Sequence, residues 1–201
     1  DGYVLLRNPQ NRDPEKIIIE HGRAVTCLVG LRGSDNVHYR IVSGDEVGKV
    51  RLWDLQTGNT TTIIEHSKRV NCLAVFTDGT VVSASEDKNV QLWGRTETKS
   101  IPHSRVKFLV LTNGRIVSGG WDNTIRLWDP EMTVAKKCIV HESTLTCLTA
   151  LSDGRVVFGN GSITVLLWDS KMREITKIIE HGDGVTCLAG LPDGRVVFGG
   201  R

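Results

Sequence analysis

Short apolar runs alternate with short polar breaks along the whole chain, and the runs are rich in β-branched residues. One stretch holds four such runs, at Thr61–Ile64, Val70–Phe76, Thr80–Ala84 and Asn89–Trp93. No window long enough for a helix keeps an apolar stripe of helical spacing without a polar break, so the periodicity favours strands. An Asp-Gly or Asn-Gly pair between two apolar runs indicates a tight hairpin. Such pairs occur at Asp78-Gly79, Asn113-Gly114, Asp153-Gly154 and Asp193-Gly194. The pattern predicts an all-β protein.

The same pattern recurs with a period close to 40 residues. Trp53, Trp93, Trp128 and Trp168 are separated by 40, 35 and 40 residues. Five histidines recur in step with them, at His21, His66, His103, His141 and His181. A period of about 40 residues is typical of four-stranded propeller blades or of helical arrays, and the β-rich runs favour the blades. We predict one domain over residues 1–201, with repeats at approximately 17–59, 60–97, 98–134, 135–174 and 175–201 plus 1–8.

Three segments carry a family resemblance. Residues 118–129 read SGGWDNTIRLWD, residues 83–93 read SASEDKNVQLW, and residues 49–54 read KVRLWD. With a histidine at the entry of each repeat, the chain resembles the WD-repeat, or β-transducin repeat, family of β-propellers. The glycine that usually precedes the histidine is mostly absent, and its place is taken by Glu20, Glu65, Pro102, Val140 and Glu180. The resemblance covers essentially the whole chain. It implies a β-propeller of four-stranded WD-type blades.

The resemblance also implies a buried hydrogen-bond relay in each blade, from the histidine through a serine or threonine and an aspartate to the tryptophan. The relay is complete in the second repeat with His66, Ser83, Asp87 and Trp93, and in the third with His103, Ser118, Asp122 and Trp128. In the first repeat Val47 stands at the aspartate position, although Asp45 or Glu46 could substitute. The relay is broken in the last two repeats, by Phe158 and Ser162 in the fourth and by Phe198 in the fifth. A fully satisfied network makes a blade rigid, whereas a partial one is costly.

The two ends of the chain match the repeat when they are joined. The fifth repeat stops at VVFGGR, and the chain begins DGYVLLRN, in phase with IVSGGW and DNTIRLWD of the third repeat. We therefore predict that the first strand closes the last blade of a five-bladed ring. The closing residues are Tyr3, Val4, Leu5, Leu6 and Arg7. Two alternatives remain open: five repeats of a seven-bladed ring, and a strand donated to a neighbouring chain in a dimer.

Composition narrows the class of protein further. The 25 Lys and Arg residues nearly balance the 23 Asp and Glu residues, giving a net charge of +2, which is too small for a typical nucleic-acid-binding domain. No apolar run is long enough for a membrane span, and no signal peptide is visible. Four of the five cysteines share one repeat position, an expected apolar core slot, and no Cys-x-x-Cys pair indicates zinc. Five free thiols favour a reducing, cytoplasmic location.

Catalysis and metal binding are not expected. A serine, a histidine and an aspartate in one repeat could be interpreted as a catalytic triad, but the trio recurs in phase with a tryptophan and lacks an oxyanion-hole motif. The predicted innermost strands, which start at Val25, Val70, Val106, Leu145 and Val185, contain no Asp or Glu. Glycoside hydrolysis needs two facing carboxylates. Histidines placed one per blade would lie too far apart to share a metal ion. We expect no enzyme activity, no metal and no cofactor.

Binding of a partner is the expected function. In the family, the usual contact face carries the histidine loops and the aspartate turns. The candidate partner-binding residues on that face are Trp121, Arg105, Arg69, Arg23, Glu86 and Arg201. Exposed Trp and Arg side chains are enriched at binding hot spots, and Trp121 stands at the tip of a predicted turn. We expect a monomeric, non-catalytic scaffold that binds a protein or peptide, with no nucleic-acid or membrane partner. A glycan-binding five-bladed module is the alternative.

Overall fold

Every element among the described residues is a β-strand, as the sequence predicts. The structure is a computed structural model that describes residues 2–6, 16–32, 39–76, 78–94, 100–102, 106–110, 115–128, 135–140, 144–160, 164–169, 174–180 and 184–200. Within these ranges no helix has the length and apolarity to cross a membrane. The chain divides into two compact halves, an N-terminal half over residues 1–103 and a C-terminal half over residues 104–201.

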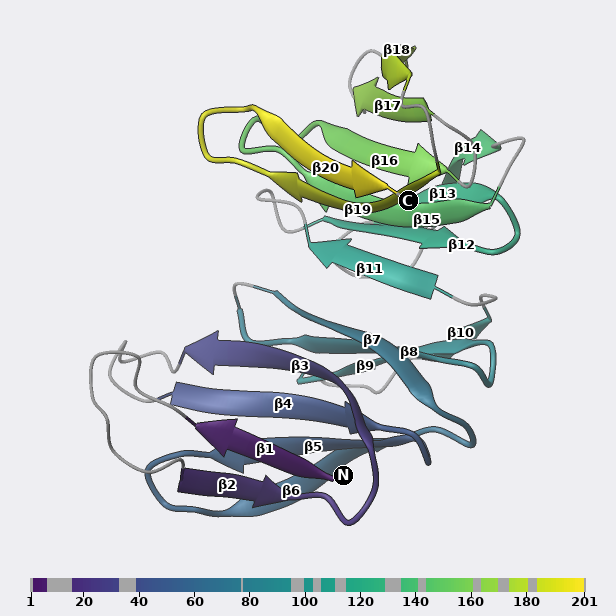
Figure 1. Ribbon diagram of the computed structural model, residues 1–201. Helices are drawn as coiled ribbons and strands as arrows, with labels where there is room; N and C mark the ends of the chain where they lie inside the picture. The colour runs from purple at the N-terminus through teal and green to yellow at the C-terminus, as the bar shows by residue number, and fades with distance from the viewer. Residues whose placement is uncertain are drawn as a thin grey trace. The chain divides into compact units, whose positions relative to one another are not determined.

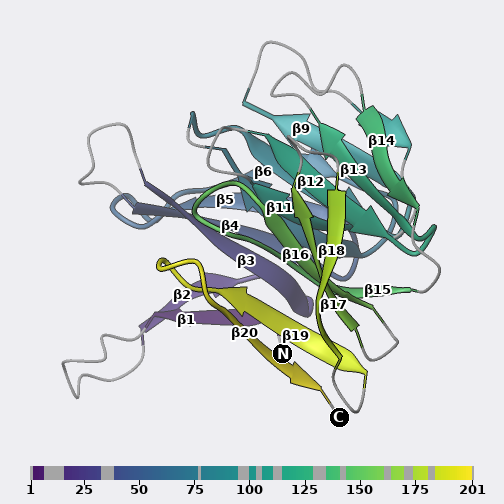
Figure 2. The ribbon, with the colours of Figure 1, turned by 90° about the horizontal axis from the view of Figure 1, so that it is seen from above.

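The N-terminal half contains two four-stranded antiparallel sheets and one strand pair (Figure 1). The first sheet has the order β3 (Val25–Arg32), β4 (Tyr39–Asp45), β5 (Lys49–Asp54) and β6 (Thr60–Glu65). The second has the order β7 (Val70–Val75), β8 (Val81–Ser85), β9 (Asn89–Trp93) and β10 (Ser100–Pro102). The pair consists of β1 (Tyr3–Leu6) and β2 (Lys16–Glu20), which lie side by side in Figure 2.

The C-terminal half repeats this plan with two four-stranded sheets and a second strand pair. One sheet has the order β11 (Val106–Val110), β12 (Ile116–Gly120), β13 (Thr124–Trp128) and β14 (Ala135–Val140). The next has the order β15 (Leu145–Ala150), β16 (Val156–Asn160), β17 (Thr164–Asp169) and β18 (Glu174–Glu180). The pair consists of β19 (Val185–Gly190) and β20 (Val196–Gly200), with β19 packed beside β15.

Each sequence repeat is displaced by one strand from the sheet to which most of it belongs. β6 begins the second repeat, yet it pairs with β5 of the preceding sheet. A compact turn explains this pairing, because the Asp54 amide donates to the Asn59 carbonyl over 3.0 Å and the Asp54 carboxylate caps the Gln56 and Thr57 amides. After β6 the chain passes through His66 into the next sheet. The His66 loop therefore joins two neighbouring sheets.

Two register shifts recur at equivalent positions of the sheets. Between the first and second strands, the shifts lie at Val25/Cys27, Val70/Cys72, Leu145/Cys147 and Val185/Cys187. Between the third and fourth strands, the shifts lie at Val50/Arg51, Ile125/Arg126, Val165/Leu166 and Val4/Leu5. Bulges of this kind are built-in features of a fold. By this criterion β19–β20 is a first-and-second strand pair, and β1–β2 is a third-and-fourth strand pair.

The core lies between neighbouring sheets within each half. β8, β12 and β16 are buried along their whole length. In the N-terminal half, Val42 and Val50 of one sheet pack with Val70 and Val81 of the next. In the C-terminal half, one cluster joins Val117 to Leu145, Phe158 and Trp168, and another joins Cys147 and Val157 to Val185. Apolar contact between sheets is therefore what holds each half together.

The strand pair β19–β20 differs from the complete sheets on one face. Val197 is 54% exposed, whereas Val157 at the equivalent position is fully buried. Cys187 is exposed as well, whereas Cys147 is buried. Cys147 therefore lies in the predicted apolar core slot. Cys187 is exposed because, among the described strands of the C-terminal half, no further sheet packs on this face of β19–β20.

Candidate functional site

The histidine loops and the aspartate turns meet at one edge of the N-terminal half. Three backbone hydrogen bonds join them, from the amides of Glu46, His66 and Glu86 to the carbonyls of Ala24, Gly48 and Arg69, at 3.0, 2.9 and 2.9 Å. Gly48 has a φ of 101°, and a Cβ at this position would collide with the His66 carbonyl, so the close approach requires glycine. Segments 21–24, 45–49, 66–69 and 85–89 therefore form a continuous surface, which we call the N-terminal turn edge.

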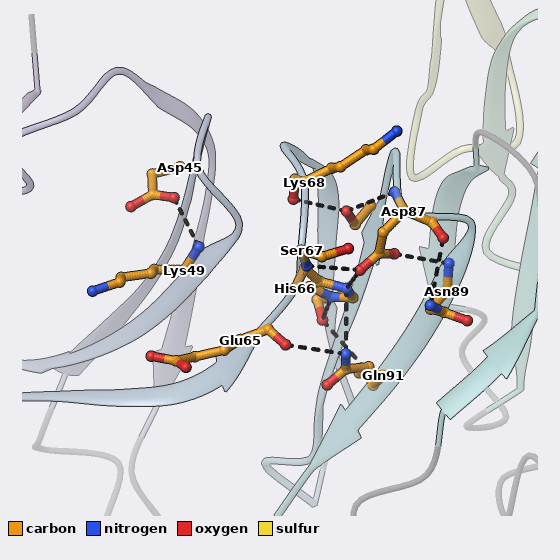
Figure 3. A network of polar contacts seen from close by, with 11 residues as sticks. Asp45, Lys49, Glu65, His66, Ser67, Lys68, Asp87, Asn89 and Gln91 are labelled. Carbon is orange, nitrogen blue, oxygen red and sulfur yellow. Dashed lines mark hydrogen bonds and ion pairs between the residues drawn. The ribbon is translucent and has the colours of Figure 1, made fainter.

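In the second repeat, three of the four predicted relay residues are in contact. His66 Nδ1 donates to Asp87 Oδ2 over 3.0 Å, as Figure 3 shows. His66 Nε2 lies 2.8 Å from Ser83 Oγ. Asp87 also accepts from the Ser67 amide at 3.1 Å and from the Asn89 amide at 2.9 Å. Burial alone would raise the pKa of Asp87, but these hydrogen bonds and the neighbouring imidazole lower it overall. The carboxylate thus fixes both the histidine and the turn.

Trp93, the predicted fourth member, does not complete this relay. In the described part of the chain no hydrogen bond joins its indole to Ser83, whose hydroxyl instead lies 3.4 Å from the Gln91 carbonyl. The tryptophan link is present in the third repeat, where Trp128 Nε1 donates to Ser118 Oγ over 2.7 Å.

The first repeat forms a relay through Asp45. His21 Nδ1 donates to Asp45 Oδ2 over 3.2 Å, and His21 Nε2 accepts a short hydrogen bond from Ser43. The indole of Trp53 donates to Ser43 Oγ over 2.8 Å. Because a carboxylate is only an acceptor, Nδ1 carries the imidazole proton and Nε2 is left to accept from the serine. Asp45 Oδ1 also accepts from the Val47 amide at 3.1 Å and the Lys49 amide at 2.8 Å.

The aspartate of the third repeat has different partners. Asp122 accepts from Arg126 Nη2 at 2.7 Å and from the Thr124 hydroxyl at 2.7 Å, while its predicted partner His103 lies outside the described residues. In the fourth repeat the serine position holds Phe158, which is fully buried. Ser162, the residue at its aspartate position, also lies outside the described residues.

The two described histidine relays cannot act as catalytic triads. Ser43 and Ser83 are both fully buried, so no substrate reaches their hydroxyls. The Ser43 oxygen also accepts a hydrogen bond from the buried indole of Trp53. This arrangement positions side chains and does not activate a nucleophile. Both ring nitrogens of His21 and His66 are engaged, and neither ring is free to bind a metal ion. These relays are therefore structural.

The candidate binding residues are exposed wherever the structure describes them. Trp121, at the turn between β12 and β13, is 62% exposed. Arg23, Arg69 and Glu86 are exposed on the N-terminal turn edge. Arg105 and Arg201 lie outside the described residues. The sequence analysis missed Val47, which is 44% exposed on the same edge. The sequence signal for Val47 is an apolar residue at the position that holds the relay aspartate in the second and third repeats.

The predicted ring-closure residues are partly described. Tyr3 is half exposed, and Val4 is buried in a cluster with Trp53, Val25 and Ile41. Leu5 and Leu6 lie on β1, although the structure does not describe their side chains, and Arg7 lies outside the described residues.

The first relay makes stability dependent on pH. Burial and the positive charge of Arg51 lower the pKa of His21 below its usual value of 6.5, against the opposing effect of Asp45. The unfolded chain then binds more protons than the folded one, so stability falls as the pH drops through 6.5. We expect the urea midpoint of the wild type to fall more steeply than that of His21→Asn between about pH 7.5 and about pH 5.5. Parallel curves for the two proteins would contradict this expectation.

Comparisons with known proteins agree with this architecture. Residues 58–94 and 99–129 match the family model of the WD domain, G-beta repeat. The crystal structure of the WD40 beta propeller domain of Doa1 is 22% identical with a TM-score of 0.67, covering 80% of this chain and 57% of that chain. The crystal structure of the computationally designed Ika8 protein is 22% identical with a TM-score of 0.68, covering 92% of this chain and 59% of that chain. The chain thus spans less than two thirds of either structure. No curated protein matches it.

Proposed function

Because this chain carries WD repeats, we propose that it is a non-catalytic scaffold that binds a protein or peptide through its histidine loops and aspartate turns. The single observation that carries the proposal is the exposure of Trp121, a large aromatic side chain at the tip of a turn. Buried relays at the base of the described turns support a structural role for the histidines and leave binding to the exposed tips.

The turn that presents Trp121 is held in place by the next residue. The Asp122 carboxylate accepts hydrogen bonds from Thr124 and Arg126 across the turn, and Asn123 adopts a φ of 55°. A tip whose backbone is fixed before binding loses little conformational entropy when it is covered by a partner. Trp121 therefore combines the residue type most enriched at hot spots with a preorganised support.

We expect Trp121→Ala to weaken partner binding by about 2 kcal/mol or more and to change the melting temperature little, since the side chain is mostly exposed. Affinity capture identifies the partner, and a titration beside a melting curve gives both quantities. Tyr39→Ala, which removes another exposed aromatic side chain at the end of β4 away from the aspartate turn, is the matched control. A large loss of stability in Trp121→Ala would mean that the indole supports the fold, and would contradict an anchoring role.

An exposed tryptophan also suits stacking on a sugar ring, so a glycan-binding module is the second candidate function. A glycan array measured with the wild type and with Trp121→Ala separates the two. Glycan binding that depends on Trp121, together with no captured protein, would favour the sugar-binding alternative.

We further propose that β19–β20 and β1–β2 are the two halves of one blade, so that the chain forms a five-bladed ring. Their register shifts support this division into a first-and-second pair and a third-and-fourth pair. In the N-terminal half, Val4 shares a buried cluster with Trp53, and Trp93 packs against the cluster that contains Val50. The β1–β2 pair thus occupies the position of the outer half of a preceding blade.

In the C-terminal half, the β19–β20 pair occupies the position of the inner half of a following blade. Val185 packs beside Gly159, where a Cβ would lie 3.0 Å from the valine, just as Val70 packs beside Gly44. Within the C-terminal half, a Cβ on Gly199 would meet only Cys187 of its own strand pair.

A further inference from the structure

The first and second relays take their aspartate from different positions of the turn. In the second repeat the turn residue Asp87 holds His66. In the first repeat Asp45, two residues earlier, holds His21, so the position equivalent to Asp87 carries Val47. An apolar side chain 44% exposed at a turn tip contributes little to the core, and the relay no longer needs this position. Exposed apolar groups of this kind, surrounded by polar residues, mark interaction surfaces.

The backbone around Val47 is fixed. Its amide donates to Asp45 Oδ1 over 3.1 Å, and Gly48 on its other side accepts the His66 amide over 2.9 Å. Gly48 cannot move away from the neighbouring loop without breaking that hydrogen bond. The turn therefore holds Val47 in a defined position before any partner arrives, which lowers the entropic cost of binding.

Positive charge surrounds this apolar tip. Five exposed basic residues lie on the N-terminal turn edge: Arg23, Lys49, Lys68, Arg69 and Lys88. None of them forms an ion pair with any residue that the structure describes. The carboxylates of Asp45 and Asp87 are engaged by the histidines and by backbone amides, which leaves only Glu46 and Glu86 as exposed carboxylates there. Figure 3 shows Lys68 directed away from the relay.

These loops form one surface and not scattered tips. The Glu46 amide donates to the Ala24 carbonyl, and the Ser85 hydroxyl donates to the Lys68 carbonyl over 2.8 Å. The basic side chains and Val47 are thus carried on segments that are hydrogen-bonded to one another. An acidic partner would meet complementary potential on approach, which favours association and orientation.

We propose that the N-terminal turn edge docks an acidic peptide, whose apolar side chain covers Val47 while its carboxylates pair with Arg23, Lys68, Arg69 and Lys88. The proposal rests on the proposed scaffold function and names the chemistry of the partner. A peptide fits better than a nucleic acid because exposed Val47 offers an apolar contact to an aliphatic side chain.

Fluorescence anisotropy with a labelled peptide of Glu, Asp and Leu residues tests the proposal. We expect saturable binding that weakens as salt is added. The companion peptide with Gln and Asn in place of Glu and Asp should bind about tenfold more weakly or not at all. Arg23→Glu with Lys68→Glu should lose about tenfold or more, and Val47→Ser a smaller but measurable factor. If the charge reversals reduce the yield of folded protein, the neutral double variant Arg23→Gln with Lys68→Gln takes their place in the binding measurement.

Arg155→Glu with Arg195→Glu is the matched control, because it makes the same change in net charge in the C-terminal half, at the β15–β16 and β19–β20 hairpin turns. This control should bind the acidic peptide like the wild type. Equal losses of peptide binding in both double variants would mean that net charge alone explains the effect, and would overturn the proposal. Binding of single-stranded RNA in preference to the peptide would also overturn it. If a captured partner depends on Trp121 while the acidic peptide does not bind, the scaffold function stands and the acidic-peptide site is wrong.

Discussion

Deletion of residues 1–8 is expected to lower the melting temperature of a monomeric parent by roughly 10–20 °C, because about 5 kcal/mol of stability is lost in a chain of this size. Val4 is buried against Trp53, Val25 and Ile41, and burial of one such side chain contributes about 1.5–3 kcal/mol. The deletion also removes the strand that pairs with β2 along four residues. If β1 closes the ring, the second edge of β20 loses its partner at the same time.

Mass in solution and melting must be measured together for this deletion. Val4→Asp in the full chain should reproduce much of the loss, whereas Tyr3→Ala, next to it and half exposed, should change stability little. A dimeric parent, or a monomer indifferent to the deletion, would rule out self-closure.

The strand content of the fold could be predicted from the sequence because it depends on local, repeated signals. Asp-Gly pairs recur between apolar runs, and at Gly79, Gly154 and Gly194 the backbone has the positive φ that such turns use. The period of about 40 residues indicates blades wherever the pattern is β-rich. Which strand pairs with which was harder, because β6 belongs to the second repeat by sequence and to the first sheet by hydrogen bonding.

The details of the relay depend on geometry that spacing does not encode. Asp45 and Glu46 were both candidates for the aspartate of the first repeat, and only the direction of the side chains separates them. Asp45, the last residue of β4, is fully buried beside His21, whereas Glu46 opens the turn and is exposed. For the same reason Trp93 has the predicted position in the sequence but makes no hydrogen bond to Ser83 in the described residues. The exposure of Cys187 depends on whether another sheet covers β19, which no local pattern determines.

Asp45→Ala is expected to cost about 3–5 kcal/mol of the free energy of unfolding, the largest loss for any single relay residue, because it removes one partner of a buried pair. Its carboxylate is the acceptor for the His21 imidazole and for the Val47 and Lys49 amides. A buried donor left without its acceptor costs about 1–3 kcal/mol. Val47→Ala in the same turn should change stability by less than about 0.5 kcal/mol, because its side chain lies outside the core.

Comparison with the other repeats makes this expectation specific to the relay. Asp87→Ala removes the acceptor of His66 and of two amides, but its site is less deeply buried, so we expect about 2–3 kcal/mol. Ser162→Ala, in the repeat where the serine position holds Phe158, removes no charged acceptor and should cost least. Urea denaturation of the three variants gives the order. In a double-mutant cycle, Asp45→Ala and His21→Ala should be strongly non-additive, because each leaves the other's polar group unsatisfied. Equal midpoints for Asp45→Ala, Asp87→Ala and Ser162→Ala, or additive effects in the cycle, would mean that the relay contacts do not stabilise the blades.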